Sequence, residues 1–382
     1  MKLFQQISLI HKSPIPIHQQ LRQQLTQLIV VGGLKEGDPL PSIRALADQL
    51  DISLHTVRHA YQHLETDGLV ETRHGRRTRV VAFEIADLLQ PAGDVRTYSI
   101  GVILPALDPF AVSILEGIEY TAQASHYSLS LCVSHQDPIL ASNDIARLIT
   151  RNIDGLIIVS HDAYVMLHPE GEITRLSGLP YVLVEMPDPE GFSVRMDRES
   201  GGYQATKHLL DLGHQRIGLI TYTYDIPQLI TLHQGHQRAL EEAGLPLDPN
   251  LVSRVLGFDF AAGAQGMKNL LKVDALPTGV MAITDSMALG AMHVLRENGL
   301  HIPEDFSVVG FYNAPFAEMV DPPLTTVDAP LFELGQVATN NLTTLIEGSA
   351  SPPREVVLPT SLIVRQSSGK SKMVPSNVKM ES

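Results

Sequence analysis

Residues 37–70 read GDPLPSIRALADQLDISLHTVRHAYQHLETDGLV, and their pattern predicts two short helices joined by a tight turn. Ser42 is suited to cap the first helix, SIRALADQL, and Ser53 to cap the second, which Gly68 ends. Such a pair forms a helix-turn-helix, in which the second helix presents its N-terminal residues to the major groove of DNA. The stretch therefore predicts a DNA-binding domain, although any three-helix domain can show this pattern.

The segments on both sides extend this pattern to a small domain. Upstream, Ile17, Leu21 and Leu25 recur at helical spacing, and a pair of glycines ends that helix. Downstream, two short strands, LVET and TRVVAF, flank the basic turn RHGRR. A basic hairpin tip can reach into a minor groove or along phosphates, or it can simply be solvated. We expect a winged helix-turn-helix domain of the α+β class over residues 1–83.

The distribution of charge supports DNA binding by this N-terminal part alone. The whole chain of 382 residues has a net charge of −14. Residues 1–82 carry 10 Lys and Arg against 7 Asp and Glu, a net charge of +3, which leaves −17 for the rest. A mildly basic head on an acidic body suits a protein whose head binds DNA while phosphates repel its body.

The order of these motifs, from IPIHQQLRQQL through GDPLPSIRALADQL to TVRHAYQHLETDGLVETRHGRRTRV, resembles the winged-helix domain of the GntR family of bacterial regulators. The resemblance implies that Arg44 and Arg58 contact DNA, that Thr56 contacts a phosphate, and that the wing tip lies at His74 and Gly75. Leu54 stands where many members carry a base-reading arginine, so we expect an operator that departs from the commonest pattern. The expected DNA-binding residues are Arg44, Ser53, His55, Thr56, Arg58, His59, His74, Gly75 and Arg76.

Residues 98–366 alternate apolar strands, such as SIGVIL, RIGLIT and FSVVGF, with amphipathic helices. Continuous apolar strands with crossover helices predict parallel sheets covered on both faces. The segment is too long for one doubly wound unit, so we expect two α/β lobes. Ligands in such folds bind outside the carboxyl ends of the strands, which here is the cleft between the lobes.

The motifs RNIDGLIIVS, DRESGGYQATKHLLDLGHQRIGLI and ITDSMALGAMHVLRENGLHIPEDFSVVGF resemble the effector-binding domain of the LacI/GalR family, which has the fold of type I periplasmic sugar-binding proteins. Together with the GntR-type head, this is the composition of arabinose-repressor-like regulators. The resemblance implies two lobes that the chain crosses three times. The expected boundaries are about 98–196 and 330–350 for lobe one, about 198–327 and 353–366 for lobe two, 84–97 for a linker and 367–382 for a disordered tail.

Asp285 is the leading candidate for contact with an effector. It follows the strand VMAIT and begins a helix, so its carboxylate is expected at the cleft, where it can accept hydrogen bonds from ligand hydroxyls. The same position also suits an N-cap. Phe110 matches an aromatic position at the pocket mouth of the family, and its alternative is a place in the core. The expected effector-binding residues are Asp108, Phe110, Arg195, Gln228, Phe258, Phe260, Asp285 and Asn313.

One departure from the LacI/GalR pattern bears on the ligand. Many members carry a ligand-clamping arginine shortly before the glycine that is Gly235 here, but this chain has Ile230 and Leu232 at those positions. Arg195 or Gln228 are the candidate replacements. The missing cation favours a neutral effector such as a sugar; a nucleoside or another non-sugar effector, and a vestigial pocket, remain the alternatives.

Other features narrow the class of protein. Cys132 is the only cysteine, so there is neither a disulfide framework nor a cysteine metal cluster in the sequence, and we expect no cofactor and no metal. Nucleophile-elbow and P-loop motifs are absent, as is a setting for a pyridoxal phosphate lysine, so we expect no enzyme. An N-terminus without an apolar signal segment, and no apolar run of 18 residues, predict a cytoplasmic protein rather than a periplasmic solute-binding one.

These observations predict a ligand-responsive transcriptional regulator, most simply a repressor. We expect a homodimer that places two heads on a roughly palindromic double-stranded operator. A small-molecule effector between the lobes then changes the spacing or orientation of the heads and so the affinity for DNA.

Overall fold

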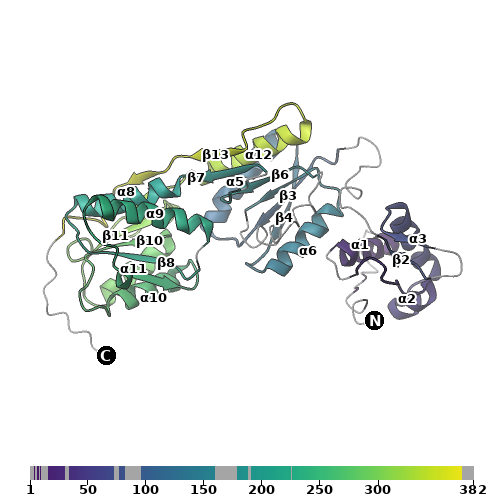
Figure 1. Cartoon of the computed structure of the whole chain (residues 1–382), viewed down its shortest axis with the longest axis horizontal. Helices are drawn as coiled ribbons and strands as arrows, with labels where there is room; N and C mark the ends of the chain where they lie inside the picture. The colour runs from purple at the N-terminus through teal and green to yellow at the C-terminus, as the bar shows by residue number, and fades with distance from the viewer. Residues whose placement is uncertain are drawn as a thin grey trace.

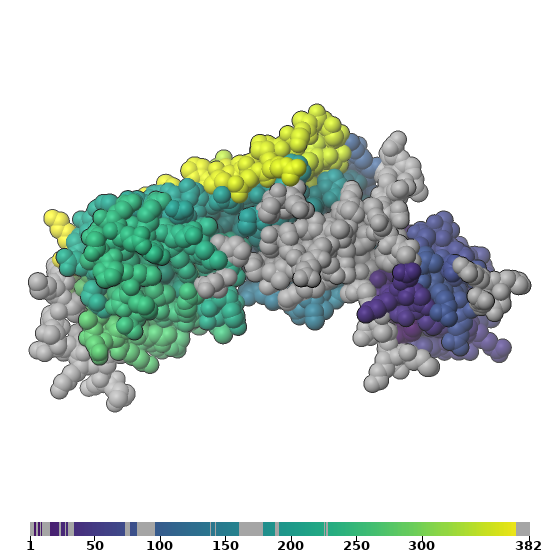
Figure 2. Space-filling view, in the orientation of Figure 1, coloured from purple at the N-terminus to yellow at the C-terminus, as the bar shows by residue number. Residues whose placement is uncertain are grey.

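The computed structural model describes residues 4, 7, 9, 16–30, 34–72, 77–81, 96–159, 179–187, 191–224 and 226–371. They form a small N-terminal head and a body of two α/β lobes, with lobe two and the head at opposite ends of the molecule (Figures 1 and 2). Among the residues that the structure describes, no helix is both long enough and apolar enough to cross a membrane.

The head has the predicted helix-turn-helix, with a short antiparallel pair of strands. Its elements are α1 (Ile17–Val30), α2 (Ile43–Leu50), α3 (Leu54–Thr66), β1 (Val70–Glu71) and β2 (Arg79–Val80). The hydroxyl of Ser42 accepts a hydrogen bond from the Ala45 amide, and that of Ser53 accepts one from the Thr56 amide, so both predicted N-caps form. The three helices pack around fully buried leucines and Val57, which recur at helical spacing.

Lobe one contains a six-stranded parallel sheet in the order β13-β7-β6-β5-β3-β4. Its strands are β3 (Ser99–Leu104), β4 (Ser128–Val133), β5 (Gly155–Ile158), β6 (Tyr181–Val184), β7 (Ser193–Met196) and β13 (Glu355–Leu358). Its described helices are α5 (Pro109–Ala124), α6 (Pro138–Ile149) and α12 (Leu331–Glu347). Buried aliphatic strands explain this arrangement, since a parallel sheet needs apolar side chains on both faces.

Lobe two contains the second six-stranded sheet, in the order β14-β12-β11-β10-β8-β9, parallel except for β14. Its strands are β8 (Ile217–Tyr222), β9 (Val252–Val255), β10 (Gly279–Ala282), β11 (Ser307–Tyr312), β12 (Thr325–Asp328) and β14 (Ser361–Ile363). Its helices are α8 (Arg198–Asp211), α9 (Pro227–Glu242), α10 (Phe260–Leu270) and α11 (Asp285–Glu297), with short 3-10 turns at Pro249–Leu251 and Pro315–Glu318. The predicted fold class of two doubly wound lobes is confirmed.

Three pairs of helices pack so closely that glycine is required at the contact. Gly117 of α5 and Gly335 of α12 form one such pair in lobe one. In lobe two, Gly202 and Gly235 join α8 to α9, and Gly263 and Gly290 join α10 to α11. A β-carbon at any of these six positions would collide with the backbone of the partner helix. The two helices of each pair therefore lie backbone against backbone.

The chain crosses between the lobes three times, and the last crossing differs from our expectation. The first lies at Asp197 and the second after β12. We expected residues from 353 onward in lobe two, but β13 pairs in parallel with β7 of lobe one, so the third crossing lies between β13 and β14. The sequence EVVL of β13 identifies a strand and not its partner.

The expected disordered tail also begins too early. The Ser367 hydroxyl donates to the Val308 carbonyl at 2.6 Å, the Gly369 amide to the Ser307 hydroxyl at 3.0 Å, and the Ser371 amide to Leu212. These residues fasten the chain to lobe two as far as 371. Polar composition suggested disorder, but short polar side chains here serve as hydrogen-bond partners for the end of the sheet. Residues 372–382, and 84–95 of the expected linker, lie outside the described residues.

Candidate functional site

The exposed face of the helix-turn-helix has the geometry of a DNA-reading surface. Arg44 on α2 and His55 and Arg58 on α3 are all exposed, and the Leu54 side chain is 48% exposed at the start of α3. At this place Leu54 can contact a thymine methyl group. Ser53 and Thr56 lie at the same helix end, where their hydroxyls are 2.7 Å apart.

Of the other expected DNA contacts, one is half-buried and three lie outside the described residues. His59 was expected to contact DNA, but its ring lies on the face of α3 that packs on α1, with its centroid 4.4 Å from that of His18 and 4.7 Å from that of His63. The His59 ring thus points to the seam with α1, one helical turn after His55, and its contact with DNA stays a prediction. His74, Gly75 and Arg76 lie outside the described residues.

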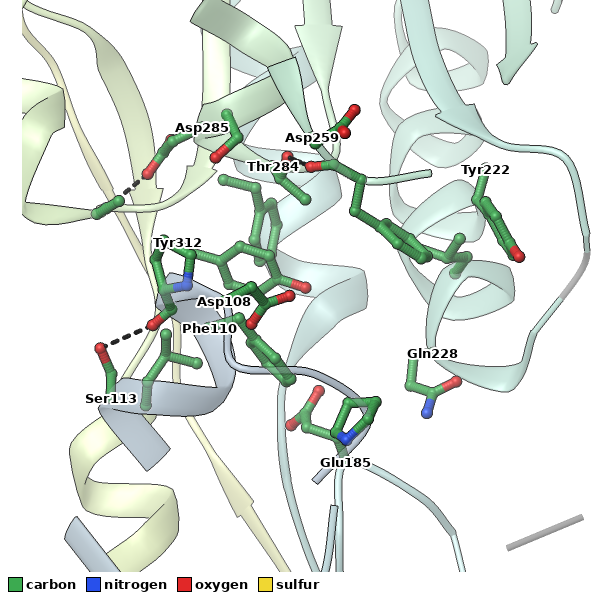
Figure 3. A pocket seen from close by; sticks show the side chains of 18 of the residues that line it. Asp108, Phe110, Ser113, Glu185, Tyr222, Gln228, Asp259, Thr284, Asp285 and Tyr312 are labelled. Atoms are coloured by element: carbon green, nitrogen blue, oxygen red, sulfur yellow. Dashed lines mark hydrogen bonds between the residues drawn. The ribbon is translucent and has the colours of Figure 1, made fainter. Parts of the chain in front are cut away.

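A pocket of about 800 Å³ lies between the two lobes. Figure 3 shows its lining side chains, which come from the carboxyl ends of strands and the first turns of helices in both lobes. This is where ligands bind in open α/β sheets. Six of its residues come from the expected set, namely Asp108, Phe110, Gln228, Phe258, Asp285 and Asn313.

Aromatic rings from both lobes line this pocket. Tyr222 and Phe258 of lobe two stack with centroids 4.5 Å apart and an interplanar angle of 29°. Phe110 of lobe one lies against Tyr312 of lobe two, with centroids 5.0 Å apart. Phe260, the alternative to Phe258, points away: it is 45% exposed and does not line the pocket. The rings offer flat apolar faces to a ligand from two sides.

Asp285 lies deep in the pocket, with only 2% of its surface exposed. Thr284 caps α11, so Asp285 is free of the N-cap role. One carboxylate oxygen accepts a hydrogen bond from the Ala314 amide at 2.6 Å, and the other accepts one from the Thr326 hydroxyl. Burial raises the pKa of Asp285 to about 7, against these two hydrogen bonds, which lower it. Asp285 thus fixes the loop after β11, and its remaining lone pairs are the ones left for a ligand.

Arg198 and Glu185 form the main feature that we did not predict. Arg198 begins α8 in lobe two, Glu185 follows β6 in lobe one, and both side chains are almost completely buried at the pocket wall. The guanidinium donates to one Glu185 oxygen at 2.6 Å and to the Tyr312 hydroxyl at 2.9 Å, while the other Glu185 oxygen accepts from the Met196 amide. Burial opposes the charge on Arg198, but Glu185 and Tyr312 outweigh it and raise the pKa. The network joins the two lobes directly.

A rule already used for Asp285 could have found Glu185, but not its partner. Glu185 ends the strand LPYVLVE, so its carboxylate also follows the carboxyl end of a parallel strand. Arg198 lies in the motif DRESGG at the first crossing between the lobes. Its burial has no signal in a single sequence, since arginines are usually exposed.

The remaining expected residues have other partners. Arg195 lies on β7 outside the pocket, where it donates to Glu355 of β13 at 2.6 Å, so it does not replace the missing clamp. The Asn313 amide joins Asp328 to Arg365. Asp108 caps α5 by accepting a hydrogen bond from the Ala111 amide. Gln228 differs from all of these, because its Oε1 is buried and has no hydrogen-bond partner among the described residues.

Comparisons with known proteins assign both parts of the chain. Residues 17–80 match the model of bacterial regulatory proteins of the gntR family, and residues 206–368 match that of a periplasmic binding protein-like domain. The transcriptional repressor CytR of Escherichia coli K12 is 31% identical over 87% of this chain and 98% of its own length. The ribose operon repressor of Haemophilus influenzae Rd is 30% identical over 71% of this chain and 81% of its own.

A solved structure supports the same assignment. The LacI family transcriptional regulator of Enterococcus faecium, determined with bound ribose, is 31% identical and superimposes with a TM-score of 0.63 over 72% of this chain and all of its own. These relatives are regulators and not enzymes, as the sequence led us to expect. The chain therefore belongs to the LacI family of transcriptional regulators, in which it is a repressor with a GntR-type DNA-binding domain at its N-terminus.

Proposed function

We propose that this repressor is released from its operator by a small neutral ligand rich in hydroxyl groups, most simply a sugar. The observation that carries the proposal is the charge and polarity of the pocket. Among the described residues that line it, four are carboxylates and one is a cation. The four are Asp108, Glu185, Asp259 and Asp285. An anionic ligand would meet net negative charge in a partly buried site, where screening is weak.

The one cation in that lining does not offset this balance. The charge of Arg198 is already paired with Glu185, and its guanidinium also donates to Tyr312, so a bound phosphate or carboxylate would compete with a buried ion pair. The positions of the usual clamp do not compensate, because Leu232 is fully buried and neither it nor Ile230 lines the pocket. This supports a neutral ligand over an anionic one.

Gln228 supports a ligand that donates hydrogen bonds. A buried carbonyl oxygen without a partner costs about 1–3 kcal/mol, which a ligand hydroxyl would recover on binding. Sugars combine several such hydroxyls with an apolar ring face that stacks on aromatic side chains. The relative with bound ribose has its ligand in the same fold, and this makes D-ribose the first sugar to test.

A nucleoside is the second candidate. The stacked pair of Tyr222 and Phe258 on one side and Phe110 on the other could hold a flat base, with its ribose directed to the carboxylates. The two candidates share the sugar hydroxyls and differ in the base, so they can be separated by direct competition.

The proposed mechanism uses a homodimer on a palindromic operator. Ligand binding between the lobes changes their relative orientation, and the Arg198–Glu185 pair that joins them is re-formed or strained in the process. A coupling of about 1–3 kcal/mol between ligand and DNA is typical of such linkage. The monomer–dimer equilibrium can be measured by sedimentation.

The test uses the full chain and a DNA duplex selected by the chain from a random pool. We expect D-ribose or another neutral sugar to raise the melting temperature and to weaken DNA binding, as measured by fluorescence anisotropy. Ribose 5-phosphate serves as the matched anionic control and should do neither. Release of DNA by the phosphate ester alone would overturn the proposal, and so would tight DNA binding that no sugar or nucleoside changes.

A further inference from the structure

Four histidines gather where α1 packs on α3 of the head. His55, His59 and His63 are spaced four residues apart on α3, so they share one face of that helix, and His18 faces them from the first turn of α1. The centroid of the His18 ring is 4.4 Å from that of His59 and 6.2 Å from that of His63. These rings contact one another across the seam between the two helices.

The geometry of three of these rings is that of a preformed set of metal ligands. One ring nitrogen each from His18, His59 and His63 lies within 4.8 Å of the other two, and all three side chains are half-buried. Nitrogens bound to one zinc ion at about 2.0–2.1 Å lie about 3.3 Å apart, so small side-chain rotations close the set. A pair of histidines four residues apart on one helix, with a third from a neighbouring helix, leaves a fourth position open to water or to His55.

The state of protonation also suits a metal. Imidazole binds a metal only when it is neutral. Burial lowers the pKa of His18, and repulsion from His59, His63 and His55 lowers it further. One helical turn beyond the cluster, Arg22 of α1 donates to Asp67 after α3 at 2.9 Å. That salt bridge links the two helices that carry the histidines.

We propose that His18, His59 and His63 form a binding site for a divalent transition metal ion such as Zn²⁺ or Ni²⁺. An ion at this site ties α3, the helix that carries the DNA-reading residues, to α1. It therefore stabilises the head, and it makes the head responsive to the concentration of free metal independently of the pocket between the lobes.

The decisive experiment is a calorimetric titration of the untagged, metal-free full chain with ZnCl₂ at pH 7.5. We expect one ion per chain at micromolar concentration and a higher melting temperature of the head, because the ion binds the folded state. His59→Gln and His63→Gln should each weaken binding at least about tenfold, since each removes one of three ligands. His301→Gln, at an exposed histidine of lobe two, is the matched control and should bind as the unaltered chain does.

Two further measurements make the result unambiguous. Co²⁺ absorption should report nitrogen coordination in the unaltered chain and lose intensity in His59→Gln. Binding should weaken between pH 7.5 and 5.5, because protons compete for the same nitrogens. Unchanged Zn²⁺ affinity in both glutamine variants, with helix content kept by circular dichroism, would overturn the site, as would no binding to the unaltered chain at 100 µM Zn²⁺, about a hundred times the expected range.

Discussion

The predicted DNA-reading face of the head and the pocket of the body place their candidate functional side chains in opposite physical settings. Arg44, Leu54 and Arg58 project from their helices into solvent. Arg198 and Asp285 are buried and bonded to residues that shape the fold. A residue of the first kind can be changed without disturbing the structure, whereas a residue of the second kind serves binding and stability together. Substitutions on the head should therefore change DNA binding alone, whereas substitutions in the pocket should change ligand binding and stability together.

The largest effect is expected at Arg198. Arg198→Met leaves the Glu185 carboxylate buried without its partner, which should cost about 3–5 kcal/mol in the free energy of unfolding. Arg195→Met is the matched control, because its pair with Glu355 is partly exposed and is worth about 0–1 kcal/mol. Chemical denaturation of both variants checks the difference. Equal losses would mean that burial does not set the strength of these pairs.

The next effect concerns Asp285 and pH. Its pKa is raised from 3.8 to about 7 in the folded chain, so folding favours the protonated form. Its contribution to stability is complete below about pH 4 and is lost as pH rises to about 7, by about 4 kcal/mol over the window. Asp285→Asn cannot titrate. The stability of the unaltered chain relative to this variant should therefore fall between pH 4.5 and 7.5 in urea denaturation, and a constant difference would contradict the raised pKa.

On the head, Arg58→Ala should weaken binding to the selected DNA by about 1–3 kcal/mol and leave the melting temperature unchanged. Arg296→Ala, at an exposed position of α11, removes the same charge far from the head and should leave DNA affinity nearly intact. Fluorescence anisotropy and a thermal melt distinguish the two outcomes. A changed melting temperature with unchanged DNA affinity would mean that Arg58 serves the stability of the head and not DNA binding.

The smallest effect is expected at Gln228, which lines the pocket but has no hydrogen-bond partner for its buried Oε1 among the described residues. Gln228→Leu removes a buried oxygen that has no protein partner, so stability should hold or rise slightly. Sugar affinity should fall by about 1 kcal/mol, since one hydrogen bond to the ligand is lost. Gln234→Leu, exposed on the same helix, should change neither quantity. Calorimetric titration with the effector measures the difference, and a loss of stability would assign Gln228 to the fold.

The contrast between the regions also explains what a sequence reveals. Helix caps such as Ser42 and Ser53, and strands such as β10, follow from local rules, and the structure has them where those rules place them. Asp285 and Phe258 were found because strand ends and motifs point to the pocket. Local rules carry no information on partners, however, and the errors at Arg195 and β13 are both errors of partner.

The buried pair of Arg198 and Glu185 shows the same limit from the other side. The two residues are 13 positions apart in the sequence, and their contact depends on the first crossing and on the end of β6, which only the assembled lobes bring together. A contact between two lobes can be recognised only when the structure of both lobes is known.

The glycine-paired helices have a mechanical consequence. Helices that touch backbone to backbone have no layer of flexible side chains between them. Each pair should therefore move as one rigid unit. With one such helix pair in lobe one and two in lobe two, both lobes should resist internal deformation. We therefore expect ligand binding in the cleft to rotate the lobes at the three strand crossings. An alanine at any of the six glycines would force its paired helices apart, and it should weaken the coupling between ligand and DNA without touching either binding surface.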